Sequence, residues 1–241
     1  MAEKKWIPLE SNPDVLNEYA GKLGVDLEAS GLRFCDVWSL DEELLAMVPR
    51  PVAAVLLLFP ITDETEAARK QEQQEIEGRG QEVSPSAFYM KQTIGNACGT
   101  IGLLHSLANN AHALSIAEGS FLQQFLAATQ GLGPAERGAY LEHPPEGGPD
   151  IDSIHESAAR QGNTAAPPPD EEVNLHFAAF VCRDGALYEL DGRKAAPINH
   201  GPCPPDQLLE RTAGVVRRNF MDRASGAVQF NLIALAAPGE D

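Results

Sequence analysis

The sequence has no hydrophobic run long enough to cross a membrane. Its longest apolar stretch, PVAAVLLLFPI, covers only residues 51–61 and contains two prolines, whereas a membrane-spanning helix needs about 20 apolar residues. The first residues, MAEKKWIPLE, include lysines but no apolar segment after them, unlike a secretory signal. We therefore expect a cytoplasmic protein, with the nucleus as a second location.

Cysteine and basic residues are both scarce. Four cysteines in 241 residues are too few for a disulfide framework, and we expect them to be reduced thiols. Lys and Arg number 18 against 35 Asp and Glu, a net charge of −17. Such a charge repels the phosphates of nucleic acid and favours a basic partner or a basic segment of a substrate. A role in solubility alone remains open.

What the sequence does contain predicts a mixed α+β domain. Helical patterns cover 11–25, 39–48, 114–129, 134–143 and 204–223, and a further one begins at Cys98. Buried strands are predicted at 50–61 and 227–237, and a hairpin at 174–194. Residues 62–83 are charged and read as an exposed helix or a surface connection. This order of elements predicts a central sheet flanked by helices.

Residues 142–174 differ from the rest in composition. They are rich in proline and in acidic residues, so they bury little apolar surface and order throughout is not expected. A segment of this kind is a long functional loop or a linker between domains. The residues after it have no obvious core of their own. We therefore interpret 1–241 as a single catalytic domain, with 142–174 as a flexible loop within it.

The predicted hairpin places a histidine near an aspartate. If Asp184 and Gly185 form a two-residue turn, facing residue numbers add up to 369 across the two strands. His176 and Asp191 are then diagonal neighbours on one face, within side-chain reach. A carboxylate there fixes the imidazole tautomer and aims the other ring nitrogen outward. A slip of one residue would separate the two.

Cys98 lies among small residues in KQTIGNACGTIGLLHSLANN, residues 91–110. At a helix start and beside an imidazolium its thiolate would be stabilised, and Gln92 with the Cys98 amide could hold an oxyanion. A Cys-His-Asp site is one hypothesis and a packing cysteine another. Two weaker alternatives are a glycine-rich dinucleotide loop, whose spacing is absent, and a zinc site without any CxxC pair. The zinc site would use His176, Cys182, His200 and Cys203.

At these residues the sequence resembles the ubiquitin carboxyl-terminal hydrolases, a family of papain-like cysteine peptidases. The two signature blocks are KQTIGNACGTIGLLHSLANN and LHFAAFVCRDGALYELDGRKAAPINHG, and WIPLESNPDVLNEYAGKLGV, MVPRPVAAVLLLFPIT and FNLIALAA match the remaining segments. The similarity extends over the whole chain and is greatest to the small single-domain L-type isozymes. It implies a papain-like fold with a knotted backbone, and a crossover loop at 142–174 that spans the active site.

The resemblance also implies the chemistry. Cys98 would be the nucleophile, His176 the general base and acid, Asp191 its orienting residue and Gln92 the oxyanion donor. The reaction would release small or unfolded adducts from the C-terminal glycine of ubiquitin through a thioester, with no metal or cofactor. Related ubiquitin-like modifiers are further candidate substrates, and a monomer is expected.

Residues that would contact ubiquitin follow from the same resemblance. They are Pro8, Leu9, Glu10, Ser11, Asn12, Pro13, Ala158, Ala159, Arg160, Gln161, Gln229 and Phe230. The alternative function is a protein that binds and stabilises monoubiquitin and whose hydrolysis is incidental. The intact set of four site residues favours the enzyme.

Overall fold

A computed structural model describes residues 4–145, 148, 150–164, 167–168, 171, 173–224 and 229–239. Its centre is an antiparallel six-stranded sheet of order β2-β8-β3-β5-β6-β7. These strands are β2 (Arg33–Asp36), β3 (Val52–Pro60), β5 (Leu175–Arg183), β6 (Ala186–Leu190), β7 (Ile198–Pro202) and β8 (Asn231–Ala236). A separate two-stranded ribbon joins β1 (Val25–Asp26) to β4 (Ser115–Ile116).

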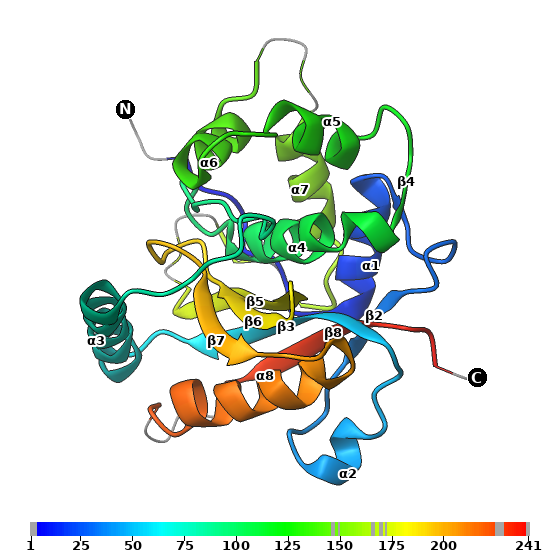
Figure 1. The fold of residues 1–241 in the computed structure, drawn as a ribbon. Coiled ribbons are helices and arrows are strands. Elements are labelled where there is room, and N and C mark those ends of the chain that lie inside the picture. The colour runs from blue at the N-terminus through cyan, green and yellow to red at the C-terminus, as the bar shows by residue number, and fades with distance from the viewer. Residues whose placement is uncertain are drawn as a thin grey trace.

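Helices cover both faces of the sheet (Figure 1). On one side lie α1 (Pro13–Lys22), α4 (Cys98–Asn109), α5 (Phe121–Ala128), α6 (Pro134–Glu142) and α7 (Ile151–Ala159). On the other lie α2 (Glu42–Leu45) and α8 (Leu208–Val216), while α3 (Asp63–Arg79) stands beside β7. The mixed α+β class and the antiparallel sheet flanked by helices are confirmed.

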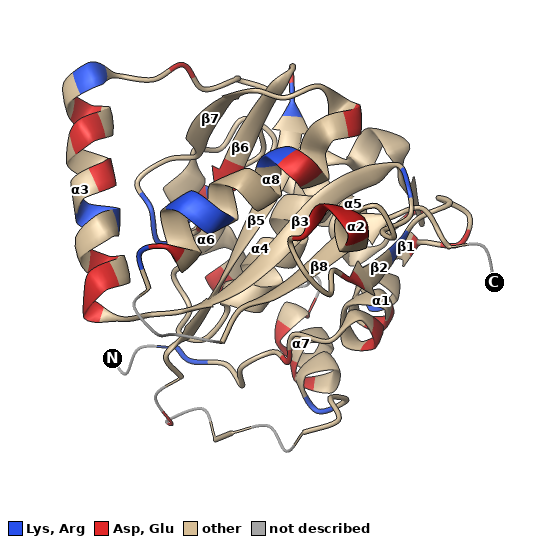
Figure 2. Cartoon of the chain, turned by 90° about the horizontal axis from the view of Figure 1, so that it is seen from below, with Lys and Arg blue, Asp and Glu red and all other residues tan. Residues whose placement is uncertain are grey.

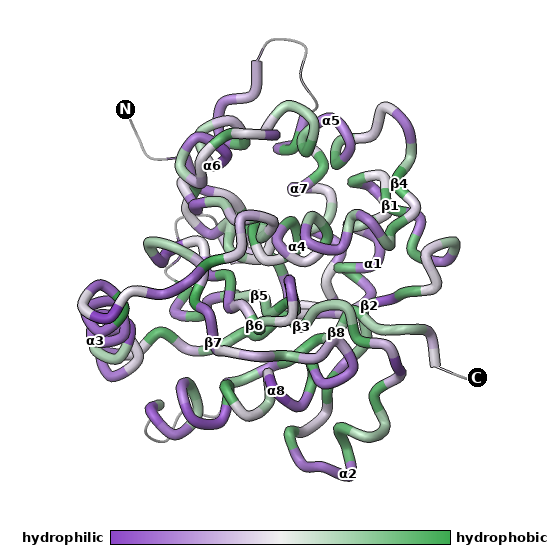
Figure 3. The backbone as a smooth tube through the Cα atoms, viewed as in Figure 1, coloured by the Kyte–Doolittle hydropathy of each residue, from purple (hydrophilic) through white to green (hydrophobic). Residues whose placement is uncertain are grey.

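The two layers of helices create two hydrophobic cores, separated by the sheet. Along β3, Leu56 packs into the core on the α4 side, whereas Val55 and Leu57 pack into the core on the α8 side. A strand covered on both faces has apolar residues in succession rather than in alternation, and Figure 3 shows such continuous hydrophobic colouring along the central strands. In contrast, α3 is hydrophilic along its length, with Ile76 as its buried residue.

Local sequence signals account for α1 and for the β5–β6 hairpin. The side chain of Asn12 caps α1 by accepting a hydrogen bond from the Asp14 amide, and Pro13 occupies the first helical position. In the hairpin, Asp184 and Gly185 adopt φ values of 49° and 75°, as a tight two-residue turn requires. The pairs Val181–Tyr188 and Phe180–Glu189 have the predicted register.

Several predicted boundaries were wrong. The helix expected at 39–48 is only four residues long and begins after Asp41, because Ser39 donates to the Asp41 carboxylate and does not cap the helix. The helix expected at 114–129 starts at Phe121, where Ser120 caps it, since residues 115–116 pair with β1. The helix expected at 204–223 contains α8 and then a π-helical turn, Arg217–Met221. Strand β7 was not predicted.

The interpretation of 142–174 as a segment that buries little apolar surface missed a helix within it. Residues 151–159 form α7, which buries Ile151, His155, Ala158 and Ala159. These positions have the i, i+4, i+7 and i+8 spacing of one helical face, which the proline-rich flanks obscured. His155 receives a hydrogen bond from Thr100 and stacks on Trp6 with ring centroids 4.2 Å apart. Helix α7 therefore fastens the N-terminal segment to α4.

None of the helices among the described residues has the length and apolar composition needed to cross a membrane.

Candidate active site

Cys98 is the first residue of α4, and the chain before it is shaped to expose its side chain. Asn96 adopts a φ of 59°, which turns the backbone sharply into the helix. The preceding Gly95 pairs with Lys5, and its carbonyl accepts a hydrogen bond from the Trp6 amide at 2.9 Å. Cys98 is half-buried and lies at the positive end of the helix dipole, which stabilises a thiolate.

His176 lies near the start of β5 and is held on two sides. Its Nε2 atom is 2.6 Å from Oδ1 of Asp191, and both side chains are almost fully buried. Phe59, its partner on β3, packs against the imidazole edge at a centroid distance of 5.6 Å. Nε2 is thereby occupied, and the ring also forms a hydrogen bond with Cys98, for which Nδ1 is left. The predicted Cys98, His176 and Asp191 therefore come together.

The turn that carries Asp191 is fixed by its own backbone. The amide of Arg193 donates to Oδ1 of Asp191 at 2.9 Å, and the hydroxyl of Tyr89 donates to the Asp191 carbonyl at 2.7 Å. Between them, Gly192 approaches Gln92 so closely that a Cβ atom there would lie 3.0 Å from the Gln92 backbone nitrogen. This glycine allows the Asp191 turn and the Gln92 segment to touch.

Charges in the site favour an ion pair of imidazolium and thiolate. Burial works against charge on both groups, but the Asp191 carboxylate outweighs it and raises the pKa of His176 to about 10. Burial likewise opposes the Cys98 thiolate, yet the hydrogen bond and positive charge of His176 hold the pKa of Cys98 below its usual value. The same imidazolium lowers the pKa of the buried Asp191. His176 and Asp191 are therefore charged at neutral pH, and the charge of His176 favours the thiolate form of Cys98.

Gln92 borders the site through its backbone, which donates to the Gly192 carbonyl at 3.0 Å. Its side-chain Nε2 donates to the Ile94 carbonyl at 3.1 Å, and its buried Oε1 has no hydrogen-bond partner among the described residues. Gln92 is thus fixed beside the Asp191 turn, with one hydrogen of its side-chain nitrogen donated to Ile94.

A cavity of about 390 Å³ opens beside Cys98. The N-terminal segment forms one wall through Pro8, Leu9, Glu10 and Ser11, while the start of β5 contributes Leu175 and Phe177 to another. Gly99 lets the N-terminal segment run close to α4, since a Cβ there would lie 2.9 Å from that of Leu9. The nucleophilic sulfur therefore faces a largely apolar groove.

The sequence profile described as "Ubiquitin carboxyl-terminal hydrolase, family 1" matches residues 6–222. The chain belongs to this family. Among its relatives are a probable ubiquitin carboxyl-terminal hydrolase of Dictyostelium discoideum, 46% identical over 99% of this chain and 91% of that protein, and isozyme L1 of Rattus norvegicus, 46% identical over 95% and 96%. The prediction of a ubiquitinyl hydrolase of the cysteine type is confirmed at the level of the family.

Solved structures agree with the family assignment. The catalytic domain of Trichinella spiralis UCH37, crystallised with ubiquitin vinyl methyl ester, superimposes with a TM-score of 0.72 at 25% identity and covers 98% of both chains. The match extends over nearly the whole length of this hydrolase and confirms its papain-like fold.

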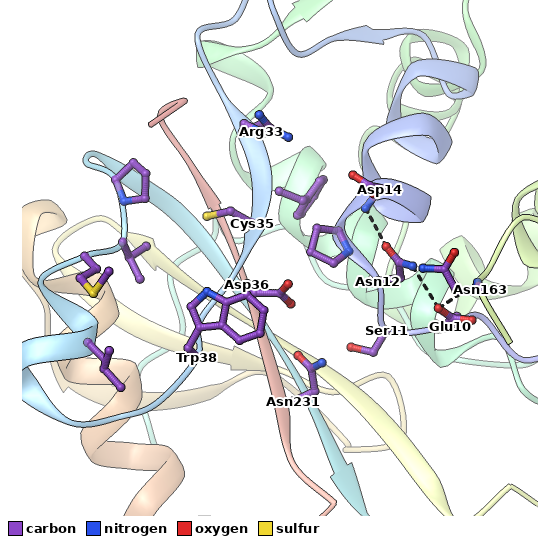
Figure 4. Close-up of a pocket in the computed structure, with 16 residues that line it drawn as sticks. Glu10, Ser11, Asn12, Asp14, Arg33, Cys35, Asp36, Trp38, Asn163 and Asn231 are labelled. Atoms are coloured by element: carbon purple, nitrogen blue, oxygen red, sulfur yellow. Dashed lines mark hydrogen bonds between the residues drawn. The ribbon is translucent and has the colours of Figure 1, made fainter. Parts of the chain in front are cut away.

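A second groove, of about 680 Å³, is shown in Figure 4 and shares Glu10, Ser11 and Asn231 with the cavity beside Cys98. Asn12 and Pro13 line it, together with Glu10 and Ser11, which border both hollows. Trp38 stands at its edge with 79% of its surface exposed. Each of the six consecutive predicted contact residues, Pro8 to Pro13, thus lines the cavity beside Cys98 or the groove that shares residues with it.

The other predicted contact residues are placed less favourably. Ala159 lines the groove beside Cys98, but Ala158 is fully buried in the core. Arg160 is exposed and paired with Glu156, and Gln161 donates to Glu18. Gln229 and Phe230 lie outside both grooves, and the neighbouring Asn231 lines both of them. For Ala158 the predicted contact with substrate was wrong, because α7 buries it.

Sequence reasoning missed three contributors to the hydrolase site. The backbone amide of Phe177 donates to the Cys98 sulfur, Phe59 supports the His176 ring, and Asn231 borders both grooves. Phe177 follows His176 directly, so its amide was open to prediction once the hairpin was known. No local pattern identifies the other two.

The remaining cysteines differ from Cys98. Burial raises the pKa of Cys35, Cys182 and Cys203, the last to about 12. Nowhere in the described ranges do three or more His, Cys, Asp or Glu side chains gather as a metal site would require, so the alternative zinc set is not assembled. Cys98 is therefore the cysteine with the environment of a nucleophile.

Proposed function

We propose that this hydrolase cleaves small or unfolded adducts from the C-terminal glycine of ubiquitin, with Cys98 as nucleophile and His176 as proton carrier. The observation that supports this most is a chain of hydrogen bonds that joins Asp191, His176 and Cys98. His176 lies 2.6 Å from Asp191 and forms a hydrogen bond with the side chain of Cys98. A thiolate is the reactive form of cysteine.

The proposed reaction has two steps. The Cys98 thiolate attacks the glycine carbonyl, and the resulting oxyanion is held by the Cys98 amide and the second hydrogen of the Gln92 side-chain nitrogen. Collapse of this intermediate breaks the bond to the leaving amine or thiol, which takes a proton from His176, and leaves a thioester on Cys98. His176 then takes a proton from water, whose oxygen attacks the thioester and frees Cys98 and ubiquitin.

Substrate binding is assigned to the two grooves. The C-terminal tail of ubiquitin contains arginines, and Glu10, Asp14 and Asp36 line the larger groove. Opposite charges at this surface would orient the tail toward Cys98. Figure 2 shows acidic residues on α1, α2 and α7 as well, in accord with the net charge of −17.

Selection for small adducts is assigned to the segment between α6 and β5. Glu10 accepts hydrogen bonds from the amides of Asn163 and Thr164, and Asn163 borders the larger groove and Thr164 the smaller one. This contact ties the segment to the N-terminal wall near Cys98. An adduct leaving the active site has to pass it, so folded proteins would be excluded. Ubiquitin-like modifiers with a similar tail are further candidate substrates.

A comparison of the wild type with Cys98→Ala tests the proposal. The variant should retain micromolar or tighter affinity for ubiquitin and lose turnover of a fluorogenic ubiquitin C-terminal amide. Equal turnover by both proteins would end the assignment of Cys98. Strong binding with negligible turnover in the wild type would instead favour the alternative, a monoubiquitin-binding protein. A cytoplasmic location and a monomeric state are proposed together with this function.

A further inference from the structure

A buried group of charges lines the same small cavity as Asp191. The ammonium of Lys194 is 2.5 Å from Oε1 of Glu189 and 2.5 Å from Oε2 of Glu72. The Lys194 and Glu189 side chains are only 8% and 1% exposed. The second Glu189 oxygen is 2.9 Å from Nε2 of His200.

Burial of these charges needs a reason, because desolvation of an ion pair commonly costs as much as its attraction returns. Glu189 lies on β6, whereas Glu72 lies on α3, whose other faces are exposed and hydrophilic. Lys194 therefore connects an otherwise loosely attached helix to the sheet. A second pair, from Glu66 of α3 to Arg193 at 2.9 Å, supports the same connection.

Lys194 links this group of buried charges to Asp191 through the backbone. The amide of Lys194 donates to the Asp191 carbonyl at 2.9 Å. The hydroxyl of Tyr89 lies 2.7 Å from that carbonyl and 2.7 Å from the carbonyl of Lys194, and so bridges the two ends of the turn. A cavity of about 30 Å³ is lined by Asp191, Glu189 and Lys194 together. Charges around so small a hollow interact with little screening by water.

We infer that Lys194 is a positioning residue for the Asp191–His176 pair, because it fastens the Asp191 turn to α3 and neutralises Glu189 beside it. This inference rests on the proposed roles of Cys98, His176 and Asp191. It gives a function to α3, to which the sequence assigned no chemistry. Lys194 itself touches neither the substrate groove nor the reacting atoms.

The charge balance around Asp191 determines the direction of the effect. The titratable and charged groups that face Asp191 or its cavity are His176, Glu189, Arg193, Lys194, Glu66, Arg69, Glu72, Tyr89, Lys91, His105, Cys98 and Arg223. Removal of the Lys194 charge takes away the ammonium that both Glu189 and Glu72 contact, and it makes the site more negative. A more negative site disfavours the Cys98 thiolate, so its formation moves to higher pH.

The test follows Cys98 alkylation by iodoacetamide, and kcat/KM on a fluorogenic ubiquitin C-terminal amide, from pH 5 to 9. In Lys194→Met the acid limb of both profiles should move to higher pH, by roughly half a pH unit to one pH unit. In Lys194→Arg, which keeps the charge, it should stay in place. In Glu189→Gln/Lys194→Met, which removes both charges, it should return toward the wild-type position. Glu189→Gln alone should move the acid limb to lower pH.

Arg217→Met is the matched control, since it removes a cation from the exposed pair with Asp41 and should leave both profiles unchanged. A folded Lys194→Met protein with an unmoved limb would overturn the inference, and so would a double variant that fails to restore it. If Lys194→Met does not fold, Glu189→Gln provides the test. A shift of its acid limb to lower pH would support the inference, and an unchanged or higher position would overturn it. The proposed function fails separately, if complete alkylation of Cys98 leaves the wild type active.

Discussion

Oδ1 of Asp191 accepts from Nε2 of His176 at 2.6 Å, across a hairpin that separates the two residues by 15 positions. The carboxylate receives a second hydrogen bond from the Arg193 amide at 2.9 Å, so it cannot rotate away from the ring without loss of both contacts. The imidazole is thereby held toward Cys98, with which it forms a hydrogen bond. The following predictions test this arrangement and the packing that maintains it.

Asp191→Asn should lower kcat/KM by about 100- to 10,000-fold, as expected when the orienting partner of a catalytic histidine loses its charge. The carboxylate raises the pKa of His176 to about 10, so without it burial should carry that pKa well below 10. Loss of activity should then begin at a lower pH on the basic side of the profile. Steady-state kinetics from pH 6 to 10 measure both effects.

Asp41→Asn serves as the control for this substitution, because Asp41 is exposed and its carboxylate contacts Arg217 and Ser39 at the surface. Its activity should equal that of the wild type. Wild-type kinetics in Asp191→Asn would show that the carboxylate is not needed for the reaction.

Gly192→Ala should damage the contact between the Asp191 turn and Gln92. The new Cβ would lie 2.9 Å from that of Gln92 and 3.0 Å from a methyl group of Ile101, so the turn has to shift. Such overpacking costs about 1–3 kcal/mol. We expect the free energy of unfolding in urea to fall by this amount, and activity to fall with it.

The matched substitution is Gly21→Ala near the end of α1, where nothing lies within 4 Å of the added Cβ. Alanine is the better helix former there, by up to about 1 kcal/mol, so stability should be unchanged or slightly increased. If the two alanine variants were equally stable and active, the close approach at Gly192 would have no structural role.

Stability should decrease as the pH falls from 7 to 5, because two buried histidines have to remain neutral in the folded protein. His105 accepts from the Met90 amide and donates to Leu190, while His155 bridges Thr100 and the Ile7 carbonyl. Burial lowers the pKa of each ring to about 4. The unfolded chain therefore binds more protons below about pH 6.5, and acid favours unfolding.

The two rings together should reduce the free energy of unfolding by roughly 3 kcal/mol between pH 7 and pH 5. Urea titrations at pH 7, 6 and 5 provide the measurement. His155→Gln should lose about half of this pH dependence. His143→Gln, at a ring with a side chain 78% exposed, should retain all of it. A wild-type free energy that is flat over this range would contradict the buried neutral state.

The parts of the fold that were predicted correctly depend on local chemistry. Asn12 and Pro13 begin α1, and Asp184 with Gly185 sets the register that brings Asp191 near His176. These signals act over a few residues and need no tertiary context. Half of the site could therefore be derived from the residues of a single hairpin.

The parts that were missed depend on contacts between distant segments. Helix α7 was hidden by its proline-rich flanks, and its buried face is recognisable only where His155 meets Trp6 and Thr100. The approach of Cys98 to His176 joins α4 to β5, and no spacing in the sequence fixes such a distance. Lys194 is buried in its pairs with Glu72 and Glu189, and no local pattern predicts that burial.

The reaction of the protein with a ubiquitin that carries a vinyl methyl ester at its C-terminus tests the central claim most directly, because the electrophile reports which sulfur lies at the end of the bound tail. Peptide mapping by mass spectrometry should find one ubiquitin per chain, attached to Cys98. The adduct should be absent in Cys98→Ala and should form far more slowly in His176→Ala. Attachment to Cys35, Cys182 or Cys203, or an equal rate without His176, would contradict the proposed site.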